Sequence, residues 1–97
     1  MRKEIQKEVK QLIESLKLNC SVKEFQDKVN WSYICEFQKL SENFIREFQD
    51  RVNWCWISQC QKLSESFIRK FQNKINWDYI SVYQKLSENF IREFQDK

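Results

Sequence analysis

Four cysteines are the residues of this sequence with the most versatile chemistry. They stand at Cys20, Cys35, Cys55 and Cys60, separated by 15, 20 and 5 residues, and no two of them form a Cys-x-x-Cys pair. Zinc sites in small domains usually combine cysteines and histidines at short, paired spacings, and the chain has no histidine. We therefore predict no metal site and expect free thiols in a reducing compartment.

Serines and carboxylates are the other groups that could carry out chemistry. Without histidine the chain lacks the commonest general base, and recurrent serines such as Ser41 and Ser64 stand where helix N-caps are expected. Recurrent acids such as Glu47 lie beside arginines such as Arg46, which is typical of solvated helix charges. The absence of glycine excludes a phosphate-binding loop and a dinucleotide fingerprint. We predict no catalytic residue, no cofactor and no enzymatic activity.

A period of 23 residues organises most of the chain, and its clearest copy is LSENFIREFQDRVN at residues 40–53. The period relates Phe25, Phe48, Phe71 and Phe94, and also Trp31, Trp54 and Trp77. Periods of about 20–50 residues are typical of stacked repeats, because one unit alone cannot bury its apolar face. One continuous helix is excluded, since 23 residues at 100° each leave about 140° beyond whole turns and form no continuous seam.

Each full unit is predicted to hold two short amphipathic helices. The first begins after Ser41 and carries Phe44, Ile45, Phe48 and Val52 over residues 41–52. The second begins after Asn53 and carries Trp54, Trp56, Ile57, Cys60 and Leu63 over residues 53–63. Ser64 and Asn76 are the equivalent caps of the next unit, and the recurrent Gln and Lys residues are expected to be exposed. With neither Gly nor Pro present, we predict an all-α protein, an α-solenoid of short antiparallel helical hairpins.

We expect a single domain over residues 1–97. It divides into an N-terminal capping helix (1–17), a degenerate repeat (18–40), two full repeats (41–63 and 64–86) and a partial repeat (87–97). Residues 1–17 place Ile5, Val9 and Leu12 on one face and do not match the repeat. A polar outer face of this kind is what the end of a repeat array needs.

Alignment of the units also predicts which aromatic residues are buried. The helical periodicity of Trp31, Trp54 and Trp77 with Ile and Leu favours core packing. Cys60 occupies the place of Phe37 and Tyr83, which predicts a small buried substitute for an aromatic ring. Cys35 aligns with Ser58, a polar position.

The charges and the apolar runs bear on partners and location. Lys and Arg number 17 against 14 Asp and Glu, and the net charge of +3 is spread evenly rather than gathered into a basic stripe. We therefore do not expect a nucleic-acid partner, although basic residues and exposed aromatics keep nucleic-acid binding as the alternative function. No apolar run is long enough to span a membrane, and MRKEIQKEVK is too charged for a signal peptide. We expect an intracellular, cytoplasmic protein without a membrane partner.

The last segment suggests self-association. Phe90, Ile91 and Phe94 form an apolar stripe after Ser87, and no Trp-containing helix follows to cover it. An uncovered stripe of this kind marks an interface. We predict a homodimer through the C-terminal helix, in addition to a protein partner whose identity the sequence does not give.

Three sequence segments resemble the short tandem repeats of giant DNA viruses of the mimivirus type. They are LSENFIREFQDRVNW, QKLSESFIRKFQNKINW and YISVYQKLSENFIREFQDK. The resemblance covers residues 31–97 well and residues 18–30 weakly, and it does not include the N-terminal helix. It implies a viral, host-cytoplasmic protein with a protein-binding or architectural role, and it carries no functional residues to transfer. Near-identical copies would also suit an engineered array, against which departures such as Ile75 for Val argue.

Overall fold

Two kinds of N-cap start the helices of the repeated part of the chain. Asn30, Asn53 and Asn76 start α3 (Trp31–Phe37), α5 (Trp54–Cys60) and α7 (Trp77–Tyr83). Ser41, Ser64 and Ser87 start α4 (Glu42–Glu47), α6 (Glu65–Lys70) and α8 (Glu88–Glu93). Each cap side chain accepts a hydrogen bond from the backbone N–H three residues later, which satisfies one of the unpaired donors at a helix start. The caps predicted at Ser41, Asn53, Ser64 and Asn76 are confirmed.

The computed structural model of the chain describes residues 1–96. Over that range it contains eight helices and no strand, which confirms the all-α class. The two helices not yet named are α1 (Lys3–Ser15) and the single turn α2 (Phe25–Lys28). α1 buries the predicted Ile5, Val9 and Leu12 against the rest of the core.

The helices of the units are shorter than the predicted segments, because a fixed turn follows each helix of the first kind. α4 ends where Phe48 leaves helical geometry, and the chain turns over residues 48–52. In this turn the indole N–H of Trp54 donates to the carbonyl of Gln49 at 2.9 Å. Trp31 and Trp77 donate to the equivalent glutamine carbonyls of their own turns. The Trp side chain thus closes the turn that separates the two helices.

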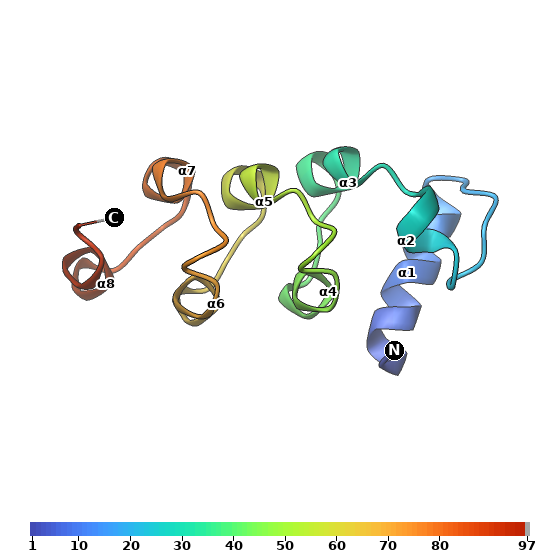
Figure 1. Cartoon of the computed structure of the whole chain (residues 1–97), viewed down its shortest axis with the longest axis horizontal. Helices are drawn as coiled ribbons and strands as arrows, with labels where there is room; N and C mark the ends of the chain where they lie inside the picture. Colours follow the sequence, from blue (N-terminus) through green and yellow to red (C-terminus); the bar gives the residue numbers. More distant parts are fainter. Residues whose placement is uncertain (97) are drawn as a thin grey trace.

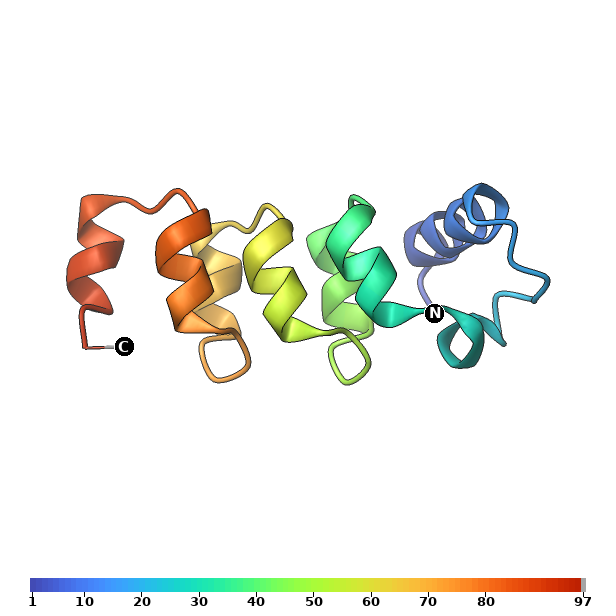
Figure 2. The same ribbon diagram turned by 90° about the horizontal axis from the view of Figure 1, so that it is seen from above.

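The helices lie in two rows (Figure 1). One row contains α3, α5 and α7, and the other contains α4, α6 and α8, with α1 and α2 at the N-terminal end. Seen from above, successive helices of a row have similar directions (Figure 2). The molecule is elongated along the rows, with extents of 46 × 23 × 19 Å, and the two ends of the chain lie at opposite ends of its long axis.

The core lies between the rows, and each full unit contributes two buried Phe rings, Phe44 with Phe48 and Phe67 with Phe71, and a few aliphatic side chains. Phe25, Phe44, Phe67 and Phe90 are almost fully buried. The Trp rings are partly buried and flank this core, with the Trp54 and Phe71 ring centroids 5.4 Å apart and those of Trp77 and Phe94 5.0 Å apart. Aromatic pairs at such distances add about 0.5–1.5 kcal/mol beyond the burial of their area.

The prediction that Cys60 is a buried substitute for an aromatic ring is wrong. Cys60 is exposed, and so are its counterparts Phe37 and Tyr83, of whose surface 64% and 55% is accessible. These residues lie on the side of α3, α5 and α7 that does not contribute to the core. Cys35 and Ser58, predicted at a polar position, are instead completely buried.

Replacement of a buried ring should reveal how much of the stability rests on this core. Phe67→Ala removes a side chain that is 1% exposed, and we expect a loss of about 3–5 kcal/mol in the free energy of unfolding. Urea denaturation measures it, and Tyr83→Ala, which truncates an exposed ring, is the matched control. Equal losses in the two variants would contradict the assignment of the core.

Candidate interaction surface

Consecutive units are joined by a carboxylate that binds the N-cap serine of the next unit. Glu42 on α4 accepts hydrogen bonds from the backbone N–H and the hydroxyl of Ser64, at 2.6 and 3.0 Å. Glu65 on α6 binds Ser87 through the same two groups. Glu8, on the non-repeated helix α1, binds Ser41 in this way at 3.0 and 2.6 Å. α1 therefore gives the first full unit the contact that a preceding unit gives elsewhere, and the capping role of residues 1–17 stays a prediction.

A second bridge between units is made by glutamine side chains that reach back into the preceding unit. The Gln61 amide donates to the carbonyls of Cys35 and Gln38 at 2.9 and 2.6 Å, and its oxygen accepts from the N–H of Leu40 at 3.0 Å. Gln84 makes the same three bonds to Ser58, Gln61 and Leu63. The prediction that recurrent glutamines are exposed is wrong for Gln61, which is 5% exposed. The sequence signal that could have indicated this structural role is the constant position of the glutamine, three residues before each N-cap serine.

The buried position shared by Cys35 and Ser58 also links neighbouring units. The Ser58 hydroxyl donates to the carbonyl of Trp54 at 2.7 Å and accepts from the N–H of Asn76 at 2.9 Å. Burial raises the pKa of the Cys35 thiol to about 11, against the opposing effect of a hydrogen bond from the N–H of Asn53. The thiol therefore stays protonated at neutral pH, and Cys35 serves as a structural group rather than a nucleophile or metal ligand.

Large apolar side chains gather on the solvent-facing side of α3, α5 and α7. We call this set the aromatic surface, and it consists of Tyr33, Phe37, Tyr79, Val82 and Tyr83, together with Trp56, which is partly buried and packs against the core. Phe37, Val82 and Tyr83 are each more than half exposed, and Tyr33 is 45% exposed. The ring centroids of Tyr33 and Phe37 are 5.0 Å apart, and those of Tyr79 and Tyr83 are 6.1 Å apart. An exposed apolar group of this size on one face is typical of an interaction site.

A lysine follows each helix of this row, two residues beyond its end. Lys39, Lys62 and Lys85 are all exposed and are related by the 23-residue period. Lys62 and Lys85 line the same hollow as Cys60 and Tyr83, at the end of α5 and α7. Lys62 and Lys85 therefore border the aromatic surface, which also lies near the carboxylates of Glu36 and Asp78.

The C-terminal stripe predicted for self-association is only partly at the surface. Phe90 is 1% exposed and belongs to the core, whereas Ile91 on α8 is 52% exposed and Phe94 is partly buried. Ile91 and Phe94 line an apolar groove together with Trp77, Ile80 and Leu86. The apolar groove thus lies beside α8, the helix for which the sequence predicts self-association.

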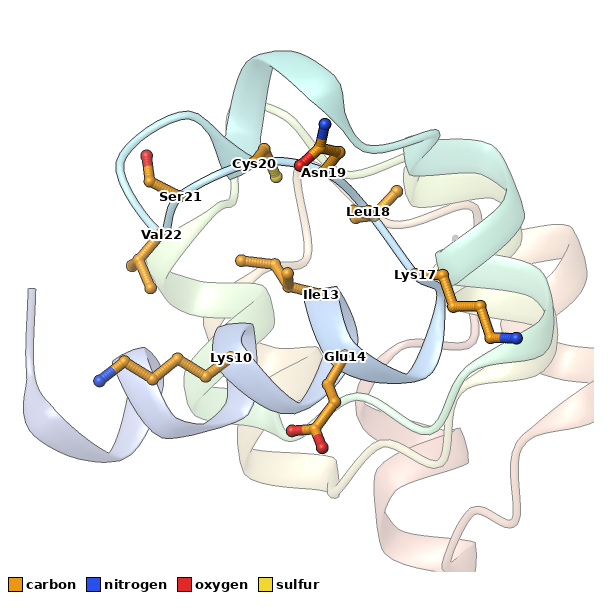
Figure 3. Close-up of a pocket in the computed structure, with 9 residues that line it drawn as sticks. All are labelled: Lys10, Ile13, Glu14, Lys17, Leu18, Asn19, Cys20, Ser21 and Val22. Atoms are coloured by element: carbon orange, nitrogen blue, oxygen red, sulfur yellow. The ribbon is translucent and has the colours of Figure 1, made fainter.

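A further hollow lies between the end of α1 and the segment at residues 17–22 (Figure 3). Lys17 has a φ of 55°, and this left-handed residue lets the N–H of Leu18 bond to the carbonyl of Ile13 at 2.9 Å, which ends α1 in a Schellman motif. Ile13 lies on the inner side of the hollow, while Lys10 and Glu14 extend away from it. The hollow thus follows from how α1 ends, and it gathers no group of catalytic side chains.

Residues 1–96, which the structure describes, also bear on metal binding and on membrane insertion. No cluster of three or more Cys, Asp or Glu side chains there is placed to hold a metal ion. None of the helices in the described range is long and apolar enough to cross a membrane. Comparisons with protein-family models, curated proteins and solved structures give no match to this chain.

The glutamine bridges should contribute measurably to stability. Gln61→Leu leaves three backbone groups of the preceding unit unpaired, and we expect a loss of about 2 kcal/mol or more, because each buried unpaired group costs about 1–3 kcal/mol. The control is Gln38→Leu at the same position of the preceding unit, since the Gln38 side chain makes no hydrogen bond to the described residues. Urea denaturation of both variants decides the matter, and a Gln61→Leu variant as stable as Gln38→Leu would exclude this role.

Proposed function

We propose that this chain is an α-solenoid of 23-residue units that acts, without enzymatic activity, as a scaffold for protein–protein interaction. The observation that carries the proposal is the aromatic surface. Its side chains come from three successive helices of one row, and its exposed members Tyr33, Phe37 and Tyr83 are not part of the core, where two Phe rings per full unit are buried. Exposed rings on α3 and α7, with the partly buried Trp56 on α5, offer a partner an extended contact.

The charges around the aromatic surface indicate the chemistry of the partner. Apolar side chains of the partner would contact Tyr33, Phe37 and Tyr83, and carboxylates would pair with the lysine border of Lys39, Lys62 and Lys85. Aromatic rings contribute a large share of the energy of protein interfaces, and charged pairs at the rim mainly increase the association rate. The expected partner is therefore an acidic protein segment with apolar side chains.

Nucleic-acid binding is the second candidate, and the row of lysines beside exposed tyrosines is the observation that favours it. The Trp side chains give it little support. Each of Trp31, Trp54 and Trp77 uses its indole N–H for a backbone carbonyl and packs its ring against a core Phe. These three are thus not free to stack on bases, which leaves Trp56, the tyrosines and Phe37.

The origin and location of the protein belong to the same proposal. The resemblance of residues 31–97 to the repeats of giant DNA viruses supports a viral protein that works in the host cytoplasm. An architectural or protein-binding role suits a chain in which the recurrent cap Ser and Asn residues and Trp31, Trp54 and Trp77 all make structural hydrogen bonds.

Loss of the aromatic surface should abolish capture of the partner and leave the fold intact. Purified chain and a Tyr33→Ser/Phe37→Ser/Tyr83→Ser variant are immobilised and incubated with lysate of a host cell, with and without nuclease, and bound proteins are quantified by mass spectrometry. We expect nuclease-resistant partners that the triple variant loses by about tenfold or more, since hot-spot rings each contribute about 2 kcal/mol or more.

A Glu47→Ser/Asn89→Ser variant, changed at exposed positions of the opposite row, is the matched control and should retain the partners. Partners that the triple variant retains would contradict the aromatic surface as the binding site. Recovery that disappears with nuclease, and a steep fall of binding with salt, would favour the nucleic-acid alternative instead.

We also propose a homodimer through α8, in which the partner is a second copy of the chain. The apolar groove beside Ile91 and Phe94 supplies the contact. Glu88 and Arg92 stand one turn apart on α8, both exposed and 3.5 Å from each other. Two α8 helices packed antiparallel about a two-fold axis would bring Glu88 of each copy near Arg92 of the other, so the charges of the paired faces complement one another.

Light scattering over a range of concentrations tests the dimer. We expect the apparent mass to approach twice that of one chain at high concentration, and Ile91→Asp to keep the protein monomeric because it places a charge in the apolar contact. Val82→Asp, at a 72% exposed position on α7, is the control and should dimerise normally. A wild-type chain that stays monomeric, or equal effects of the two variants, would exclude α8 as the interface.

A further inference from the structure

The second joint of the lower row in Figure 1, between α6 and α8, is closed by an ion pair. The Arg69 guanidinium binds the Glu93 carboxylate through two hydrogen bonds, Nε to Oε2 at 3.0 Å and Nη2 to Oε1 at 2.8 Å. The same guanidinium lies over the Phe90 ring, with 5.3 Å from Cζ to the centroid. The pair lowers the pKa of the Glu93 carboxyl through the hydrogen bonds from Arg69. Arg69 of α6 thus reaches across this joint and pairs with the Glu93 carboxylate of α8.

The preceding joint, between α4 and α6, has the same arginine but lacks the acid. Arg46 lies over the Phe67 ring, 5.8 Å from its centroid, as Arg69 lies over Phe90. The position of Glu93 is taken here by Lys70, one period earlier. Arg46 donates through Nη1 to the Asn43 side chain at 2.7 Å, but its buried Nε has no hydrogen-bond partner among the described residues. The Nε that is unpaired in Arg46 therefore corresponds to the Arg69 Nε, which donates to Glu93.

The side chains around this joint form an open hollow with a positive charge. Arg46, Lys70 and Lys74 line it together with Gln49, Phe71 and Asn73. Lys74 also pairs with Asp50, 3.2 Å away. Three cations against this one carboxylate give the lining a charge of about +2, and among the described residues neither Arg46 nor Lys70 forms an ion pair.

We propose that the hollow between α4 and α6 binds a dianion of the phosphate type, either a free phosphate or a phosphorylated side chain of a partner. The Arg46 guanidinium would turn its Nε edge, which is buried in the unliganded chain, toward the hollow and bind two oxygens of the anion, as Arg69 binds the two oxygens of Glu93. Lys70 and Lys74 would contribute point charges from the other side. A dianion matches the local charge of about +2, and it replaces the repulsion between Arg46 and Lys70 by attraction.

This site goes beyond the proposed scaffold function and does not depend on it. The hollow belongs to the row of α4, α6 and α8, whereas the aromatic surface belongs to the row of α3, α5 and α7 (Figure 1). A failure of partner capture through the aromatic surface would leave the anion site untouched, and the reverse also holds.

Binding of an anion to the folded chain should raise its stability in proportion to the logarithm of the anion concentration. The full chain is unfolded thermally, and titrated in a calorimeter, with inorganic phosphate replacing chloride at constant ionic strength so that general screening is unchanged. We expect the melting temperature to rise with phosphate. An O-phosphoserine peptide is the second probe, and tighter binding than phosphate alone would identify a phosphorylated side chain as the natural source.

Lys70→Glu is the decisive variant, because it places a carboxylate where Glu93 stands in the next joint. It should raise the melting temperature in the absence of phosphate, through an Arg46 ion pair, and lower the affinity for phosphate by about tenfold or more. Lys62→Glu makes the same change of charge in the other row and should retain the phosphate response. A wild-type chain insensitive to phosphate, or a Lys70→Glu variant that responds as the wild type does, would overturn the proposal.

Discussion

Side-chain hydrogen bonds to the backbone of a neighbouring unit are the interaction on which this fold depends. Helices of six or seven residues leave most of their first N–H and last C=O groups without an intrahelical partner, and alone they would not persist in water. Gln61 and Gln84 satisfy such groups in the preceding unit, and Glu42 and Glu65 do so in the following one. Each unit therefore completes the hydrogen bonding of its neighbours, and the apolar core adds the burial that holds the rows together.

Much of the local structure could be predicted from the sequence, because it is set by local chemistry. The Ser and Asn caps follow from side chains that compete for backbone N–H groups, and the all-α class follows from a chain without Gly or Pro. The buried phenylalanines follow from their helical spacing. Phe44 and Phe67 are indeed among the most buried side chains.

The division between core and surface could not be predicted in the same way. The second helix of each unit is apolar around much of its circumference, and only the packing of the two rows decides that Ile57 is buried while Phe37 and Tyr83 face solvent. Because Cys60 aligns with Phe37 and Tyr83, the mistaken prediction that this position is buried was applied to Cys60 as well. The burial of Gln61 was not predicted for the opposite reason. Its amide is polar, and its burial depends on backbone groups that are 21 to 26 residues away in the sequence. The aromatic surface lies on the part of the second helices that the sequence pattern alone could not assign to core or surface.

The capping role of Glu8 has a consequence for how such a protein changes its length. Ser41 requires from its predecessor little more than a carboxylate at the right place, and a helix unrelated to the repeat supplies it. The boundary between α1 and the first full unit thus repeats the carboxylate–serine contact of the internal boundaries. A change in the number of 23-residue units would preserve this contact at the N-terminal end, while individual substitutions such as Lys70 distinguish one joint from the next.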